Sequence, residues 1–135
     1  MLPPAQFNLA AHGIASGDVI ELASNGSWGY DAYWGGTGQT TGAAGIFASD
    51  ASYLPKAPLA QSQAGNSPEV APMTNACTNV TPIDNPHDFL IPDAAWARVK
   101  VPQGATRLLL GISDCYQGDN FGTVGVAIRK VQTNR

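Results

Sequence analysis

The sequence predicts an all-β fold, an antiparallel β-sandwich of the jelly-roll type, in a single domain over residues 1–135. The first observation is composition: only 13% of the residues are charged, while the chain holds 15 glycines and 10 prolines. A helical bundle needs charged side chains on its exposed faces, whereas short strands joined by many turns suit this composition. The second observation is an alternation of apolar and polar residues in several short segments. A chain of 135 residues is long enough for one domain with its own core.

Four segments alternate with a period of two residues, as strands with one buried face do. They are residues 18–23, 97–101, 107–112 and 123–131, and their expected core-facing side chains are Ile20, Leu22, Val99, Val101, Leu108, Leu110, Ile112, Val124, Val126 and Ile128. Arg98 and Lys100 are expected to face solvent. The basic residues of the C-terminal part therefore belong to exposed strand faces rather than to a ligand patch.

The middle of the chain, residues 35–86, is rich in Gly, Ala, Ser, Thr, Asn and Pro and shows little alternation. Ile46–Phe47 and Tyr53–Leu54 are the expected anchors of short edge strands or packed loops, and residues 88–91 form another short strand before Pro92. A structureless segment of this length is unusual in a compact domain. We therefore expect long loops laid over a sheet, with one or two further strands.

Charge and hydropathy disfavour two classes of partner. The net charge is −3, and six of the seven basic residues are spread over residues 98–135, so we expect no concentrated basic face for nucleic acid. Apolar runs such as Leu108–Leu110 are only three or four residues long, which predicts no membrane insertion. The first residues show no signal peptide. Cys77 and Cys115 are compatible with one disulfide bridge and equally with two buried thiols.

A candidate metal site lies between the last two expected strands. Residues 114–122 contain the only two acidic residues of the basic C-terminal part, Asp114 and Asp119, followed by Asn120. Calcium takes six to eight oxygen ligands from carboxylates, amides, backbone carbonyls and water, and two carboxylates match its charge. The alternative is that Asp114 and Asn120 only cap turns by hydrogen bonds to the backbone. Neither the histidines nor the cysteines have the spacing of a transition-metal site.

A cluster of aromatic residues is the second candidate binding feature. Trp28, Tyr30, Tyr33 and Trp34 stand between Asn25-Gly26 and Gly35-Gly36. Flat aromatic faces next to hydrogen-bonding groups suit sugar rings, whose C–H faces are apolar and whose hydroxyls are polar. The alternative is that two of the four side chains belong to the core, where tryptophan is commonly well buried.

Two parts of the chain together carry a family resemblance. The N-terminal part consists of Gly17–Ala23 and Gly26–Tyr30, and the C-terminal part consists of Gln103–Ile112, Asp114 and Asp119–Ile128. They resemble the two halves of the PA-IL-type galactophilic calcium-dependent lectins and related galactose-binding-like carbohydrate-binding modules, whereas residues 36–86 have no counterpart there. The resemblance implies a galactose-binding-like jelly roll with a calcium ion bound at the start of its last strand.

The resemblance also implies a ligand set for the ion. Asp114, Asp119 and Asn120 correspond to the side-chain ligands, and Tyr30 corresponds to a backbone-carbonyl ligand. A second carbonyl is expected from Tyr116 or Gln117. The spacing between the two aspartates is shorter than in the lectins, which leaves these two residues as alternatives.

The implied activity is calcium-dependent carbohydrate binding, in which two sugar hydroxyls coordinate the ion and Asp114 and Asp119 accept hydrogen bonds from them. The further expected sugar contacts are Trp28, Tyr33, Trp34 and His87, and Asp88 is a candidate beside His87. We expect galactosides or plant or cell-surface polysaccharides as partners and an extracellular or secreted location. Affinity for a single sugar should be modest, which favours a homo-oligomer or attachment to a larger enzyme.

Two other functions compete with sugar binding. One is a structural or adhesion β-sandwich in which calcium only rigidifies a loop. The other is a glycoside hydrolase, which needs two carboxylates flanking the scissile bond. A calcium ion would keep both aspartates ionised, and the sequence has no Gly-x-Ser-x-Gly nucleophile motif. We therefore expect no enzymatic activity.

Overall fold

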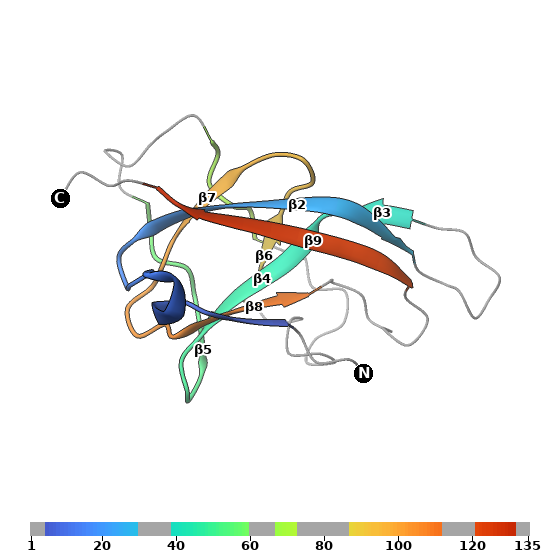
Figure 1. The fold of residues 1–135 in the computed structure, drawn as a ribbon. Helices are drawn as coiled ribbons and strands as arrows, with labels where there is room; N and C mark the ends of the chain where they lie inside the picture. The colour runs from blue at the N-terminus through green and yellow to red at the C-terminus, as the bar shows by residue number, and fades with distance from the viewer. Residues whose placement is uncertain (1–4, 30–38, 60–66, 73–86, 112–120, 132–135) are drawn as a thin grey trace.

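The computed structural model confirms the all-β prediction. It describes residues 5–29, 39–59, 67–72, 87–111 and 121–131, and within these ranges the chain forms antiparallel sheets and one short 3₁₀ helix, η1 (Ala10–His12) (Figure 1). No helix in the described ranges is long or apolar enough to cross a membrane.

Sheet A contains five strands in the order β1-β8-β4-β5, with β6 also paired to β4. Their bounds are β1 (Ala5–Asn8), β4 (Ala43–Ala48), β5 (Tyr53–Leu54), β6 (Phe89–Ile91) and β8 (Arg107–Gly111). β8 lies along one edge of β4, and β5 and β6 share the other edge, because they pair with different residues of β4.

Sheet B contains four strands organised around the long strand β2. Their bounds are β2 (Val19–Gly29), β3 (Gln39–Thr41), β7 (Ala97–Lys100) and β9 (Phe121–Lys130). β9 pairs with nearly the whole of β2 along one edge. β7 and β3 share the opposite edge, β7 at the start of β2 and β3 at its end.

The predicted strands are found, and one expectation about the middle segment was wrong. Each of the four alternating segments and residues 88–91 coincides with a strand, although β2 continues well beyond residue 23. Ile46 and Phe47, however, lie in β4, which is an interior strand rather than an edge strand or a loop. All six residues of β4 are buried. A strand buried on both faces has no polar face, so it shows no alternation in the sequence.

The hydrophobic core takes side chains from both sheets. Ile20, Leu22 and Val99 of sheet B are in one cluster with Phe47 and Leu108 of sheet A. The predicted core residues Leu110, Val124, Val126 and Ile128 pack against this cluster but are only partly buried. Ile112 lies outside the described residues.

One backbone connection joins the two sheets through a buried serine. Residues 91–94 leave β6 in sheet A and reach the edge of β2 in sheet B. There the N–H of Ser24 donates to the carbonyl of Pro92 at 2.9 Å, and the N–H of Ala94 donates to the carbonyl of Ser24 at 2.8 Å. The Ser24 hydroxyl also donates to the carbonyls of Ile91 (3.2 Å) and Pro92 (2.9 Å). Ser24 is 1% exposed, so its hydroxyl finds its hydrogen-bond partners within the protein.

A second connection, which we call the strap, consists of residues 67–72. Its backbone bonds to β7 of sheet B, where the N–H of Arg98 donates to Pro68 (2.7 Å) and the N–H of Val70 donates to Arg98 (2.9 Å). It also bonds to β6 of sheet A, where the N–H of Leu90 donates to Ala71 at 2.8 Å. Val70 itself is buried in the core. The strap therefore holds the β6 and β7 edges of the two sheets together.

We predict that Gly45→Ala destabilises the protein. A Cβ at Gly45 would lie 2.8 and 2.9 Å from two ring atoms of Phe89, which is closer than carbon atoms pack. Phe89 is 1% exposed and has little room to move, so we expect a loss of about 1–3 kcal/mol in the free energy of unfolding. Urea denaturation measures this change. The control is Gly125→Ala, where the nearest atom is 3.9 Å away. Equal stability of Gly45→Ala and the wild type would contradict the packing.

Candidate functional site

The end of sheet B brings three strand ends together. Gly29, the last residue of β2, pairs with Gln39 of β3 on one edge and with Phe121 of β9 on the other. The chain leaves β2 into residues 30–38 and re-enters at β3, and it enters β9 from residues 112–120. The two segments that carry the predicted aromatic and calcium residues are therefore attached to adjacent strands at one end of the sheet (Figure 1).

Sheet A contributes the other attachment of residues 112–120. That segment begins after Gly111, the last residue of β8, which pairs with Ala44 of β4. Only Gly42 separates β3 from β4. The Ala44–Gly111 pair of sheet A is therefore close along the chain to the residues of β3 that pair with β2 in sheet B. Residues 112–120 thus connect the two sheets, from Gly111 in sheet A to Phe121 in sheet B.

Most predicted site residues lie outside the described residues. They are Tyr30, Tyr33, Trp34, Asp114, Tyr116, Gln117, Asp119 and Asn120. Two of them adjoin a described pair, since Tyr30 follows Gly29 and Asn120 precedes Phe121. Trp28 belongs to β2, where its backbone is opposite Thr40 and Gly122.

His87 is in a different part of the fold. It is exposed and precedes the buried Asp88 and strand β6, whose Phe89 pairs with Gly45 of sheet A. The described pairings do not connect His87 to the strand ends at Gly29. Its proposed contact with a sugar stays a prediction.

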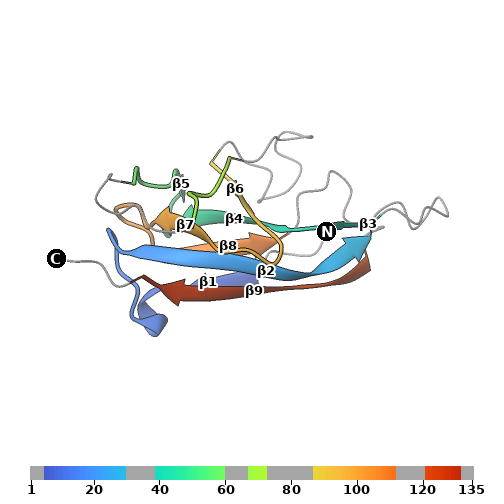
Figure 2. The same cartoon turned by 90° about the horizontal axis from the view of Figure 1, so that it is seen from above.

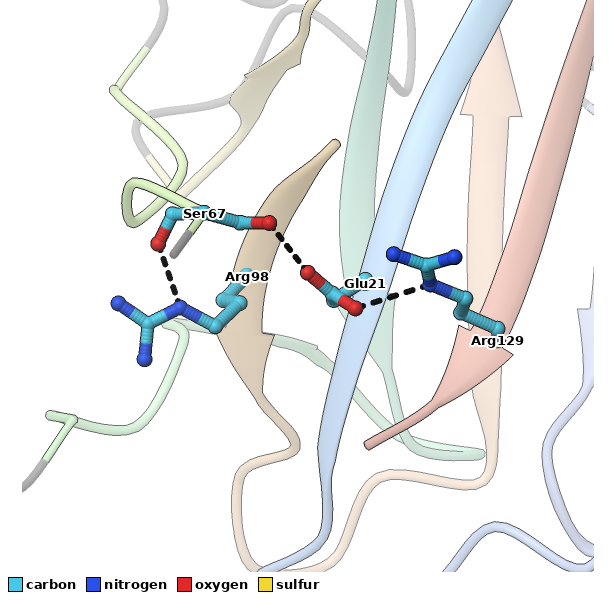
Figure 3. A network of polar contacts seen from close by, with 4 residues as sticks. All are labelled: Glu21, Ser67, Arg98 and Arg129. Atoms are coloured by element: carbon cyan, nitrogen blue, oxygen red, sulfur yellow. Dashed lines mark hydrogen bonds and ion pairs between the residues drawn. The ribbon is translucent and has the colours of Figure 1, made fainter. Parts of the chain in front are cut away.

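A polar network that the sequence did not predict lies on the outer face of sheet B. Glu21 of β2 accepts hydrogen bonds from the Ser67 hydroxyl and from Nε of Arg129, the latter at 2.9 Å (Figure 3). Nε of Arg98 donates to the backbone carbonyl of Ser67 at 2.6 Å. The Arg129 guanidinium also lies 3.9 Å from the centre of the Trp96 ring, a cation–π contact.

This network corrects the prediction for Arg98. The period-two pattern placed Arg98 toward solvent, but it is only 7% exposed. The alternation is right, because the neighbouring Ala97 and Val99 are in the core. The strap covers the outer face at this point, and the residues that form it are about thirty positions away in the sequence. A local pattern therefore cannot reveal this burial.

The network holds Glu21 as a carboxylate. The hydrogen bond from Ser67 is the largest cause that lowers the pKa of Glu21, burial opposes it, and Arg129 and Arg98 lower the pKa further. A carboxylate with a lowered pKa is a poor proton donor at neutral pH, so this group suits structural pairing rather than acid catalysis. Within the described ranges, no three His, Cys, Asp or Glu residues are grouped in a way that could hold a metal.

We predict a pH-dependent stability difference between the wild type and Glu21→Gln. Because the pKa of Glu21 is lower in the folded state, its ionised form stabilises the fold at pH values above its unfolded pKa. The wild type should therefore be more stable than Glu21→Gln at pH 7, by about 1 kcal/mol. This advantage should disappear as the pH falls through the folded-state pKa. Urea denaturation between pH 3 and pH 7 measures both effects.

The control variant is Glu69→Gln, which removes a pair between Lys56 and the more exposed Glu69. It should change stability less at pH 7, because exposed ion pairs are well solvated. A Glu21→Gln effect that is equally large at every pH would contradict the role of the charged network.

The strand ends at Gly29, Gln39 and Phe121 form the candidate site. The aromatic segment, residues 30–38, and the acidic segment, residues 112–120, both join the sheet there. The Glu21 network supports the other end of the same strands, where β2 pairs with β7. Comparison of the chain with protein-family models, with curated proteins and with solved structures found no match.

Proposed function

We propose that this protein binds carbohydrate in a calcium-dependent manner at the end of sheet B. The observation that carries the proposal is the pairing of Gly29 with both Gln39 and Phe121. It brings the attachments of the aromatic segment and the acidic segment onto adjacent strands, although about ninety residues separate Gly29 from Phe121 in the chain. Sites on segments anchored by a rigid sheet are a common arrangement for ligand binding.

We further propose that the two sheets form a β-sandwich with a jelly-roll, galactose-binding-like topology. The shared core, with Phe47 and Leu108 from sheet A packed with Leu22 and Val99 from sheet B, supports this interpretation. In such a sandwich, the connections between strands gather at the two ends of the sheets, and a ligand site at one end fits this architecture.

The proposed calcium site uses oxygen ligands from both segments. Asp114, Asp119 and Asn120 supply side-chain oxygens, Tyr30 supplies a backbone carbonyl, and Tyr116 or Gln117 supplies a second one. These ligands leave part of a coordination shell of six to eight oxygens open. Two neighbouring sugar hydroxyls complete the shell in place of water. The two aspartates offset the charge of the ion and accept hydrogen bonds from the same hydroxyls.

The aromatic residues complete the proposed sugar site. Trp28, Tyr33 and Trp34 are in or next to the segment that follows β2. An aromatic face that stacks on the apolar face of a sugar contributes binding energy that the coordinated hydroxyls alone do not supply. Galactosides and galactose-containing polysaccharides are the substrate class that we infer.

We predict that calcium stabilises the protein and that sugar binding requires it. A calcium concentration about 100 times Kd should raise the free energy of unfolding by about 2.7 kcal/mol, because the ion binds the folded state only. Thermal melts with calcium and with a chelator measure this effect. Calorimetric titration with methyl galactoside should give binding in calcium and none in chelator.

Asp119→Ala tests the shared site, with Asp50→Ala as its matched control. Asp50 is exposed in the turn after β4 and should leave both effects unchanged. Asp119→Ala should abolish the calcium shift in Tm and the sugar binding together. An unchanged Tm in calcium rejects the metal site, and calcium stabilisation without sugar binding at millimolar concentrations favours a structural ion. Normal sugar binding by Asp119→Ala rejects direct coordination.

A further inference from the structure

The strand β9 lies at the edge of sheet B, and no described strand pairs with its outer side. It runs for ten residues and pairs only with β2 among the described strands. On the opposite edge of sheet B, β7 bonds to the strap and Ser24 bonds to residues 92–94. Figure 2 shows β9 along one margin of the molecule, with η1 near its C-terminal end. Unpaired strand edges are templates for pairing with another chain.

The register identifies the backbone groups that face outward along this edge. The N–H and C=O of Ser24 point toward residues 92–94, so Ser24 does not bond to Val126, the residue opposite it in β9. In an antiparallel ladder, hydrogen-bonded and non-bonded pairs alternate. Val124, Val126 and Ile128 therefore direct their N–H and C=O groups away from β2. No backbone partner for them occurs in the part of the chain that the structure describes.

The side chains along this edge are apolar or small. Val124, Val126 and Ile128 pack against the core but are only half-buried. On the outer face, the exposed residues between them are Gly125 and Ala127. Natural edge strands are commonly protected by a proline or by a central lysine. Residues 121–128 contain neither.

The two charges of β9 lie at its C-terminal end and are both paired within the chain. Nε of Arg129 is 2.9 Å from Glu21, and Nζ of Lys130 is 3.1 Å from the buried Asp18. These bonds hold the basic groups at one end of the strand and compensate their charge. The centre of the edge is therefore uncharged and free of local repulsion.

We propose that two copies of this chain associate by antiparallel pairing of their β9 edges about a two-fold axis at Val126. In this register Val126 exchanges two hydrogen bonds with the partner's Val126, and Val124 pairs with the partner's Ile128. The half-buried apolar side chains of both copies then cover one another on the core side, and Gly125 faces the partner's Ala127 on the outer side.

The charge distribution fits this arrangement. Arg129 stands three residues from the axis, so it lies six residue steps from the partner's Arg129, about 20 Å at 3.4 Å per residue. That separation exceeds the ~10 Å Debye length at 0.1 M salt. The like charges of the two copies therefore do not oppose the pairing. The product is one continuous sheet made from both copies of sheet B.

Sedimentation equilibrium tests the dimer, with the full chain in chelator so that calcium plays no part. The monomer mass is 14.0 kDa, and the wild type should approach twice that mass as its concentration rises from micromolar to millimolar. Val126→Pro removes the central N–H donors, which have no partner within the described monomer. It should raise the dimer dissociation constant by roughly tenfold or more.

A second variant keeps the test valid if the proline disturbs folding. The double variant Gly125→Glu with Ala127→Glu changes exposed positions and gathers four carboxylates around the two-fold axis, so it should sediment as a monomer. The matched control, Ala51→Glu with Gln103→Glu, adds the same charge at exposed turns and should dimerise like the wild type. A wild type that is monomeric at every concentration overturns the proposal. A dimer that persists in the double glutamate variant overturns it as well.

Discussion

The fold depends on a buried hydrogen-bonding requirement at Ser24. Where the chain passes from sheet A to sheet B, the Ser24 hydroxyl is buried beside the carbonyls of Ile91 and Pro92, and leaving a buried polar group unbonded would cost about 1–3 kcal/mol. Ser24 meets this requirement with its hydroxyl and its backbone N–H together. The backbone bonds of Ser24 lie on the edge of β2 between the residues that pair with β7 and those that pair with β3. Each part of this edge therefore has a bonded neighbour. β9 pairs along the other edge, so β2 is bonded on both sides and sheet B is continuous.

That continuity determines where a ligand site can form. Because β2 is held from Val19 to Gly29, its pairing with β9 runs without interruption from the Glu21 network to the strand ends. A single register thus fixes the positions at which residues 30–38 and 112–120 join the sheet. The charged network at Glu21 and the candidate site at Gly29 are opposite ends of one rigid pair of strands. This rigidity is what a site built from two separate segments requires.

The sequence was sufficient to predict the strands that have one exposed face. Val99 and Val101 alternate with the polar Arg98 and Lys100, and the period of two follows directly from the pleat. The sequence did not reveal β4 as an interior strand, because its alanines, glycine and buried Ile46 provide no polar residues that would mark a period of two. It also failed for Arg98, since a distant strap covers that side chain. For the candidate site, composition singled out both segments, but their common attachment at Gly29 depends on strand order, which no local pattern contains.

Because of the strap, the two sheets are joined by different kinds of contact along their two long sides. Along β6 and β7 the sheets are joined by backbone hydrogen bonds from residues 67–72 and by the crossing at Ser24. Along β1 and β9 they are held together mainly by apolar side chains such as Phe7 and Val126. Among the described residues, backbone hydrogen bonds therefore join the sheets along β6 and β7, whereas side-chain packing predominates along β1 and β9. We expect thermal opening to begin along β1 and β9, while the strap keeps the register of both sheets.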